Sequence, residues 1–400
     1  MKGKVRLQQT EYLYLSPSSD TNGRISPDSE AAIYLHFPFC AKRCSYCDFD
    51  SFSGLDGLIE TYLEAVLQQM QMSPRALGTS LYLGGGTPSL MAPPDVAKLV
   101  SACRDRFSLH SNAEVTLEAN PSDLDREKLA GYRDAGVNRL SIGVQSTDEG
   151  LLRLLGRRHG PVEARSSIAA ARDAGFRNVS VDLIFGMPRQ DRSIWEHTLR
   201  EVAVWGVEHI SCYSLTVERG TALEKAISQG ILSLPQEDEI VGMYRAAERV
   251  LSVHGYRRYE ISNWAKPGFE SRHNLAYWSY RPYLGIGAGA AGFWNSRRYK
   301  IVPDIPRYIE GVRAGRIPLC ENDEISRRRA MSDFLILGLR LSDGVPASRF
   351  EASFGTTPQA VFGEALEWGI REGLLERQED RLVLTPQGTL LSNELFEKLL

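Results

Sequence analysis

Short apolar or β-branched runs alternate with longer helical stretches from residue 31 onward, and this alternation is the strongest constraint on the fold. The runs are AIYLHF, SLYLGGG, EVTLEAN, RLSIGVQS, NVSVDLIFG and HISCYSLT, and segments between them, such as LIETYLEAVLQQM, have the apolar period of helices. Strand–helix repeats of this kind build parallel α/β barrels. Six runs, with a seventh candidate at residues 257–263, are fewer than the eight strands of a closed barrel. We therefore expect an α/β fold with a partial, open βα barrel of the TIM type.

Composition divides the chain into four parts. We expect a flexible polar leader at residues 1–30, the partial barrel at 31–263, and a Gly-, Tyr- and Trp-rich irregular extension against the barrel mouth at 264–322. Residues 323–400 have the pattern of three helices, a small β-wing and a last helix, which predicts a small helical, winged-helix-like domain. This part holds 9 basic and 13 acidic side chains, the wrong sign for reading DNA, so we expect no nucleic-acid partner.

The charge and hydropathy of the whole chain exclude two further classes of protein. The formal net charge is −3, which provides no basic field for polyanions. No run approaches the roughly 18 to 20 apolar residues of a membrane span, and the first residues, MKGKVRLQQTEYLYLSPSSD, lack the apolar segment of a signal peptide. We therefore expect a cytoplasmic protein.

Three of the six cysteines, Cys40, Cys44 and Cys47, fall within eight residues, directly after the first strand. The spacing C-x3-C-x2-C forms a compact loop that can wrap thiolates around one cuboidal iron–sulfur cluster. Zinc is the alternative, but a structural zinc site needs four ligands, the nearby acidic residues are poor substitutes for a thiolate, and His36 lies within the strand pattern. Three cysteines leave one iron of a [4Fe-4S] cluster open, and an open iron can chelate the amino and carboxylate groups of S-adenosylmethionine.

Polar groups also occupy the ends of later strands, where parallel barrels place their chemistry. The segment Gly84-Gly85-Gly86-Thr87-Pro88 follows the second run, and its missing side chains let backbone groups approach a ligand. Glu118, Gln145 and Asp182 lie at or near the ends of the next three runs. Taken singly, each of these side chains could simply be hydrogen-bonded to a neighbouring loop, with no role in ligand binding. Together they indicate a ligand site, because burying a polar side chain without a partner costs free energy.

The motifs YLHFPFCAKRCSYCDF, LYLGGGTPS, LEANP, RLSIGVQS, LLGRRH and VDLIFGMPRQ, in this order, resemble the coproporphyrinogen-dehydrogenase-like branch of the radical S-adenosylmethionine superfamily. The resemblance covers roughly residues 31–395 and implies the partial barrel of that superfamily. It also implies a [4Fe-4S] cluster on the three cysteines and S-adenosyl-L-methionine as cosubstrate. The implied cosubstrate contacts are Tyr34, Tyr46, Gly85, Gly86, Thr87, Glu118, Gln145, Arg157 and Asp182.

Within that branch the chain looks most like the HemW-type haem chaperones. Phe49 stands where the oxidative decarboxylases have a further cysteine. Residues 272–293, RHNLAYWSYRPYLGIGAGAAGF, resemble the HNxxYW segment that is tied to haem in this family. The chemistry is suitable, since an imidazole can ligate haem iron and aromatic rings offer the macrocycle a flat apolar surface. A loop-capping role for the histidine is the alternative. Ala291 departs from the family, which often has a histidine there. The implied haem-binding candidates are His273, Asn274, Tyr277 and Trp278.

The resemblance implies a haem chaperone that binds haem as cargo and delivers it to acceptor haemoproteins. A homodimer and peripheral membrane contact are further expectations from the family. Two alternatives stay open. One is an oxygen-independent coproporphyrinogen III dehydrogenase, which decarboxylates propionates through a deoxyadenosyl radical, and the other is a haem-modifying radical methyltransferase.

Overall fold

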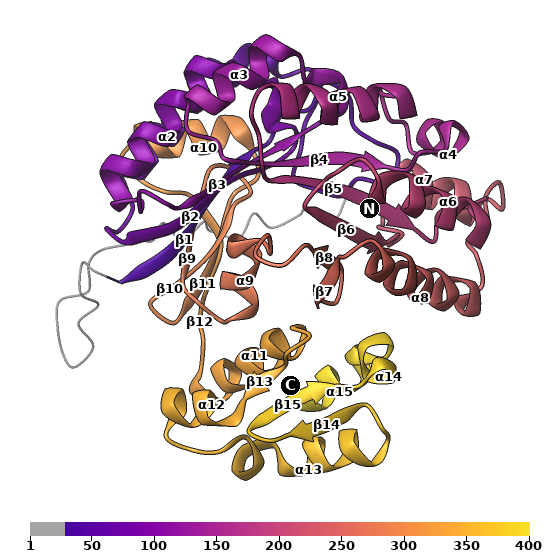
Figure 1. The fold of residues 1–400 in the computed structure, drawn as a ribbon. Helices are drawn as coiled ribbons and strands as arrows, with labels where there is room; N and C mark the ends of the chain where they lie inside the picture. The colour runs from indigo at the N-terminus through magenta and orange to yellow at the C-terminus, as the bar shows by residue number, and fades with distance from the viewer. Residues whose placement is uncertain (1–28) are drawn as a thin grey trace, which may run out of the picture.

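The structure, a computed structural model, describes residues 29–400, so all but the last two residues of the expected leader lie outside it. Six parallel strands stand side by side in chain order, as Figure 1 shows. They are β1 (Glu30–Phe37), β2 (Leu77–Gly85), β3 (Glu114–Ala119), β4 (Arg139–Gln145), β5 (Val179–Phe185) and β6 (His209–Ser214). Within the described chain the sheet has two free edges, so the predicted open, partial barrel is confirmed.

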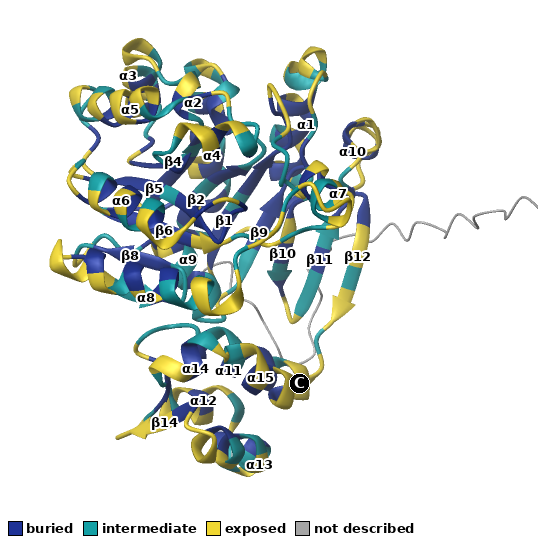
Figure 2. Cartoon of the chain, turned by 90° about the vertical axis from the view of Figure 1, so that its right-hand side faces the viewer, coloured by how far each residue is buried: buried dark blue, intermediate teal, exposed yellow. Residues whose placement is uncertain are grey.

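Helices between these strands cover one face of the sheet and bury its apolar side chains (Figure 2). No helix within residues 29–400 is long and apolar enough to cross a membrane. The helical segments of this part are α1 (Ile59–Met72), α2 (Pro93–Phe107), α3 (Arg126–Asp134), α4 (Glu149–Leu154), α5 (Pro161–Asp173), α6 (Arg192–Ala203), α7 (Ala222–Ser228) and α8 (Glu237–Val253), with short 3-10 turns η1 (Asp56–Leu58), η2 (Pro88–Leu90) and η3 (Pro121–Asp123).

Alternation along the strands decides which side chains remain for a site. Leu117 on β3 and Val181 on β5 are fully buried in the helix-covered core. Glu118 and Asp182, one position further along, lie on the other face because successive side chains of a strand point to opposite sides. The parallel strands therefore place their polar residues together on the open, concave face.

The seventh candidate strand, at 257–263, differs from the expectation in its place. Strand β7 (Arg257–Glu260) runs parallel to β6, but β8 (Asn263–Ala265) lies between them and is antiparallel to both. Only two residues separate β7 from β8, so the chain turns back in a tight hairpin and β8 takes the position beside β6.

The segment 264–322, expected to be irregular, contains helices and strands that extend the sheet beyond β1. Gly285 allows this: a Cβ there would collide with the Ala291 carbonyl, so only glycine lets β10 approach β9 so closely. The elements of this segment are α9 (Arg272–Trp278), β9 (Tyr283–Ile286), which is parallel to β1, and the antiparallel β10 (Ala291–Trp294), β11 (Arg297–Ile301) and β12 (Leu319–Glu324), with α10 (Ile305–Arg313).

The C-terminal part forms a second, smaller body below the sheet (Figure 1). It has a separate apolar core around Leu335, Phe350 and Leu395. The predicted order of three helices, a small wing and a last helix is present, with one further short helix before the last one, which confirms a helical, winged-helix-like domain. Its elements are α11 (Arg327–Leu339), β13 (Val345–Pro346), α12 (Ala347–Phe354), α13 (Pro358–Arg371), β14 (Leu375–Gln378), β15 (Arg381–Leu384), α14 (Pro386–Leu390) and α15 (Ser392–Leu399).

Candidate functional site

The three clustered cysteines lie on the loop that follows β1. A bridge between Phe39 and Phe52 closes this loop at its base, and the Cys40 amide donates to the Phe52 carbonyl oxygen at 2.8 Å. Further along, the Ser45 amide donates to the Leu155 carbonyl oxygen at 3.0 Å. The cysteine loop is therefore held at its base and again at the end of α4, which limits its freedom before any ligand binds.

Two of the cysteine sulfurs receive hydrogen bonds from outside the loop. The Thr87 hydroxyl donates to Cys40 Sγ at 3.3 Å, and Arg157 Nη1 donates to Cys44 Sγ at 3.5 Å. Donors and positive charge at sulfur stabilise a thiolate. Burial, and to a smaller extent the neighbouring thiols, raise the pKa of the Cys40 and Cys47 thiols. The cluster-free loop thus favours thiols at these two positions, and metal binding would release their protons.

The donors on this loop, three cysteine thiols, have the chemistry of iron–sulfur ligands. Zinc ligands must surround a single atom, whereas each cysteine of a cuboidal cluster binds a different iron. His36 cannot readily serve as a fourth zinc ligand, because its Nδ1 lies 2.9 Å from the Tyr34 hydroxyl and its Nε2 lies 2.9 Å from the Asp50 carbonyl oxygen.

A cavity of about 550 Å³ lies beside the cysteine loop, on the open face of the sheet. Its volume is within the range of organic-ligand sites. Tyr34, one of the nine implied cosubstrate contacts, is absent from its lining. The structure brings the other eight together there: Tyr46, Gly85, Gly86, Thr87, Glu118, Gln145, Arg157 and Asp182.

Gly85 and Gly86 are required by the backbone as well as by the cavity. Gly85 has φ +112°, and a Cβ there would lie 2.6 Å from the His36 ring. A Cβ on Gly86 would lie 2.6 Å from the Phe39 carbonyl oxygen. The close passage of this turn against β1 therefore excludes any larger residue.

The two cavity carboxylates are each held by two donors. Glu118 accepts from the Tyr82 hydroxyl at 2.8 Å and from the Gly85 amide at 3.0 Å. Burial raises the pKa of Glu118 to about 7, because the charged form loses solvation. Asp182 accepts from Ser141 at 3.0 Å and Ser211 at 2.7 Å, and burial raises its pKa as well.

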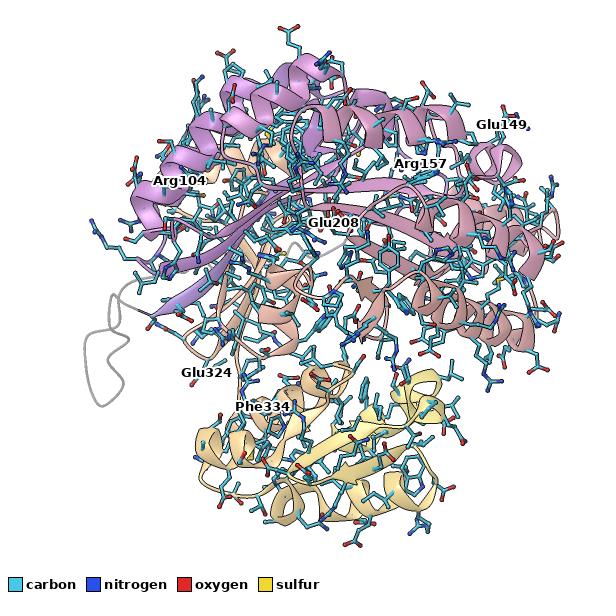
Figure 3. All side chains as sticks on the ribbon, in the orientation of Figure 1. Arg104, Glu149, Arg157, Glu208, Glu324 and Phe334 are labelled. Carbon is cyan, nitrogen blue, oxygen red and sulfur yellow. The ribbon has the colours of Figure 1, made fainter. Side chains whose placement is uncertain are left out.

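Gln145 and Arg157 meet at an irregular end of β4. The register of β4 shifts between Gly143 and Gln145, and Gln145 has φ +67°, a conformation that L side chains seldom adopt. Arg157 Nη2 donates to the Gly143 carbonyl oxygen at 2.7 Å. Figure 3 labels Arg157 beside β4 and β5. The strand end and the loop after α4 thus present an amide and a guanidinium to the same cavity.

The four residues of the HNxxYW segment separate in space. Asn274 lines the cavity beside the cysteine loop, whereas Tyr277 and Trp278 line a second pocket. His273 is 1% exposed, with Nδ1 2.8 Å from the Ser80 hydroxyl and Nε2 2.8 Å from the Tyr277 hydroxyl. Burial lowers its pKa to about 3, so the ring is neutral. Both ring nitrogens are occupied in this conformation, which leaves none for haem iron.

Sequence reasoning did not single out Tyr82, Ser141 or Ser211, which hold the two cavity carboxylates. A signal for them existed. Each faces the cavity side of the sheet, because its apolar neighbour in the strand (Leu81, Ile142 or Ile210) faces the helix-covered core. Polar residues at alternate positions of neighbouring strands would have predicted these contacts.

Comparison with known proteins first defines the class. Residues 34–202 match the profile of the Radical SAM superfamily, and residues 325–391 match that of the HemN C-terminal domain. The structure superposes on coproporphyrinogen III oxidase (HemN) from Escherichia coli with a TM-score of 0.81, covering 94% of this chain and 91% of that chain. Their identity is 21%, so this likeness concerns the fold alone. The protein is a radical SAM protein with a HemN-type C-terminal domain, a class that implies S-adenosylmethionine and a [4Fe-4S] cluster.

Closer sequence relatives define the family. The heme chaperone HemW of Bacillus subtilis is 36% identical, over 91% of this chain and 97% of the relative. The heme chaperone HemW of Mycobacterium tuberculosis is 34% identical over 94% and 96%. A zebrafish (Danio rerio) relative, radical S-adenosyl methionine domain-containing protein 1, mitochondrial, is 35% identical over 84% and 79%. The chain belongs to the HemW family.

Proposed function

We propose that this protein binds haem and delivers it to acceptor haemoproteins. The observation that carries the proposal is identity of 34–36% with heme chaperones over more than nine-tenths of this chain. The aligned regions span nearly the whole length of this chain and of each relative, so they include the barrel, the sheet extension and the C-terminal domain. A shared superfamily barrel alone would not support a chaperone.

We further propose that Cys40, Cys44 and Cys47 hold the [4Fe-4S] cluster and that the adjoining cavity receives S-adenosylmethionine. Such a cluster, when bound, supplies an open iron that can chelate the amino and carboxylate groups of the cosubstrate. The chain supplies the surroundings. Arg157 places positive charge at Cys44, and the cavity carboxylate Glu118 can accept a further hydrogen bond from a ligand donor.

The second candidate function is oxidative decarboxylation of coproporphyrinogen III. The observation in its favour is the cavity beside the cysteine loop, which eight of the nine implied cosubstrate contacts line, together with the HemN-like fold. Phe49 favours the chaperone: it is 63% exposed at the cavity rim, where the resemblance places a cysteine in the decarboxylases. Methyl transfer to haem finds no additional support in the described residues.

One experiment separates these functions. Protein reconstituted anaerobically with iron and sulfide is titrated with haem by absorbance, and the haem-loaded protein is then mixed with a haem-free acceptor haemoprotein. A parallel reaction contains coproporphyrinogen III, S-adenosylmethionine and a reductant. Stable haem binding followed by transfer is the expected result. Formation of protoporphyrinogen with release of carbon dioxide would contradict the proposal and establish the enzyme instead.

Homodimer formation, peripheral membrane contact and a cytoplasmic location stay predictions from the sequence. Size-exclusion chromatography with light scattering, vesicle sedimentation and cell fractionation would test them in turn.

A further inference from the structure

The cavity beside the cysteine loop extends beyond the residues expected to bind S-adenosylmethionine. Gln145, one of those residues, ends β4, whereas Arg139, the first residue of the same strand, also lines the cavity. The two positions are six residues apart, which is about 20 Å of backbone at the rise of an extended strand. The cavity therefore has an inner end, towards the amino ends of the parallel strands, as well as the end beside the cysteines.

The inner end of the cavity is polar and closely enclosed. Arg139 is only 2% exposed. The other lining residues at this end are His209, Ser211 and Ser271, which are all buried. Enclosed walls leave little accessible surface, so this end has room for a small polar group and not for a bulky ring.

Protein groups satisfy the guanidinium of Arg139 only in part. Its Nη1 donates to Asn178 Oδ1 at 2.9 Å and to the Phe269 carbonyl oxygen at 3.5 Å, the limit of a hydrogen bond. Nε is buried without a partner, and Nη2 has no hydrogen bond to any described residue. Arg139 also takes part in no ion pair within residues 29–400. A buried charge of this kind costs free energy until an opposite charge meets it.

The acidic side chains nearby are already engaged. Asp182 lines the same cavity, but both of its oxygens accept hydrogen bonds from serines, Oδ2 from Ser141 and Oδ1 from Ser211. Burial raises the pKa of Asp182, and the positive charge of Arg139 partly opposes that rise, so the two groups share one electrostatic field without pairing. Glu114, the buried acid at the start of β3, bonds to the first turn of α9 and does not line the cavity.

His209, which lies on the same wall, adds neither a charge nor an available nitrogen. Its Nδ1 lies 2.7 Å from the Ser180 hydroxyl, and its Nε2 lies 2.9 Å from the Tyr259 hydroxyl. Burial, and after it the positive charge of Arg139, lower the pKa of His209, so the ring is neutral. Arg139 is consequently the one charged donor at the inner end that lacks a counter-charge among the described residues.

We propose that Arg139 binds the carboxylate of a small organic acid at the inner end of the cavity, separately from the expected contacts of S-adenosylmethionine. A guanidinium is suited to this role, because its charged N–H groups match the geometry of a carboxylate. A monoanion balances the single uncompensated charge, whereas the carboxylate of Asp182 would repel a doubly charged phosphate. The inference goes beyond the proposed function, and only the separation from the cosubstrate rests on it.

The test compares propanoate with propanamide, which has nearly the same shape and no charge. Each is titrated by anaerobic calorimetry into the protein reconstituted with iron and sulfide. Wild-type protein should bind propanoate at least about tenfold more tightly than propanamide. Arg139→Met should abolish this preference, and Arg139→Lys, which keeps the charge and loses the planar fork, should retain part of it. Arg177→Met is the matched control, because Arg177 is exposed, precedes Asn178 and does not line the cavity.

Thermal unfolding shows which variants have folded. If wild-type protein has no preference for propanoate, or if folded Arg139→Met keeps the preference of Arg177→Met, the subsite is overturned and the proposed function stands. Saturating S-adenosylmethionine should change propanoate affinity less than about twofold, and displacement of propanoate would overturn the separation of the two sites. If S-adenosylmethionine itself does not bind, the proposed cosubstrate fails while the carboxylate preference still supports the subsite.

Discussion

Arg157 donates one hydrogen bond to Cys44 Sγ at 3.5 Å and a second to the Gly143 carbonyl oxygen at 2.7 Å. A single guanidinium thus joins the cysteine loop to the end of β4, although Arg157 and Cys44 are 113 positions apart in the chain. Arginine suits this task because its fixed fork can serve two acceptors at once. The cysteine loop and the cavity beside it are consequently one structural unit.

We expect Arg157→Met to weaken S-adenosylmethionine binding about tenfold and to lower the reduction potential of the bound cluster. The reason is that a positive charge beside a cluster thiolate stabilises the reduced, more negative state. Calorimetric titration with S-adenosylmethionine and an anaerobic redox titration measure the two effects. Arg153→Gln is the control, because Arg153 pairs with Glu149 on the surface at 2.8 Å and does not line the cavity. Unchanged affinity and potential in Arg157→Met would show that the guanidinium serves only the backbone.

Cys44→Ser should abolish stable cluster assembly, with iron content falling well below the roughly four per chain of a complete cluster. A serine hydroxyl is a hard, weakly acidic donor and a poor ligand for cluster iron. Iron and sulfide analysis with visible absorbance after reconstitution measures the loss. Cys320→Ser is the matched control, since Cys320 is exposed and lies on β12. Full iron content in Cys44→Ser would refute the assigned ligand.

Glu118 should make the stability of the cluster-free chain depend on pH. Burial raises its pKa from 4.5 to about 7, so the folded chain binds this proton more tightly than the unfolded chain. The free energy of unfolding therefore falls as pH rises from about 4.5 to about 7. Glu118→Gln removes the charge. Its free energy of unfolding should exceed that of wild type by about 1 to 3 kcal/mol at pH 8, with little difference near pH 4.5. Urea unfolding across this pH range measures the difference, with Glu149→Gln, on exposed α4, as control. The same pH slope in both variants would contradict the prediction.

His273→Ala should lower the free energy of unfolding by about 2 to 4 kcal/mol even without haem. The substitution leaves a void and removes the partner of both the Ser80 and Tyr277 hydroxyls. Urea unfolding of the haem-free protein provides the measurement. Tyr277→Phe, which loses one hydrogen bond and keeps the ring, should cost about 1 kcal/mol. Normal stability of His273→Ala combined with loss of haem binding would instead point to iron ligation by this histidine.

Much of the barrel and of the candidate site follows from local patterns. The runs RLSIGVQS and VSVDLIFG predict two parallel strands whose polar residues Gln145 and Asp182 face one cavity, although Asp182 lies at the centre of β5 and not at its end. The C-x3-C-x2-C spacing is also a local pattern, and it predicts a compact loop that carries three cysteines. Of the nine cosubstrate contacts expected from the sequence, eight line the cavity. The prediction failed at Tyr34, which lines the second pocket instead. Alternation along β1 predicts the face of the sheet on which Tyr34 lies, but not which of the two pockets on that face it lines.

By itself, the sequence determined the open parallel barrel, the cysteine loop and the C-terminal helical domain, because periodicity and spacing are local properties. Only the tertiary structure decided the place of β8 between β6 and β7, the place of β9 beside β1, and the division of the HNxxYW segment between two pockets. Those outcomes depend on partners far along the chain. His273 is the clearest example: an imidazole that suits haem iron is occupied by Ser80, 193 positions away, and no local pattern encodes that contact.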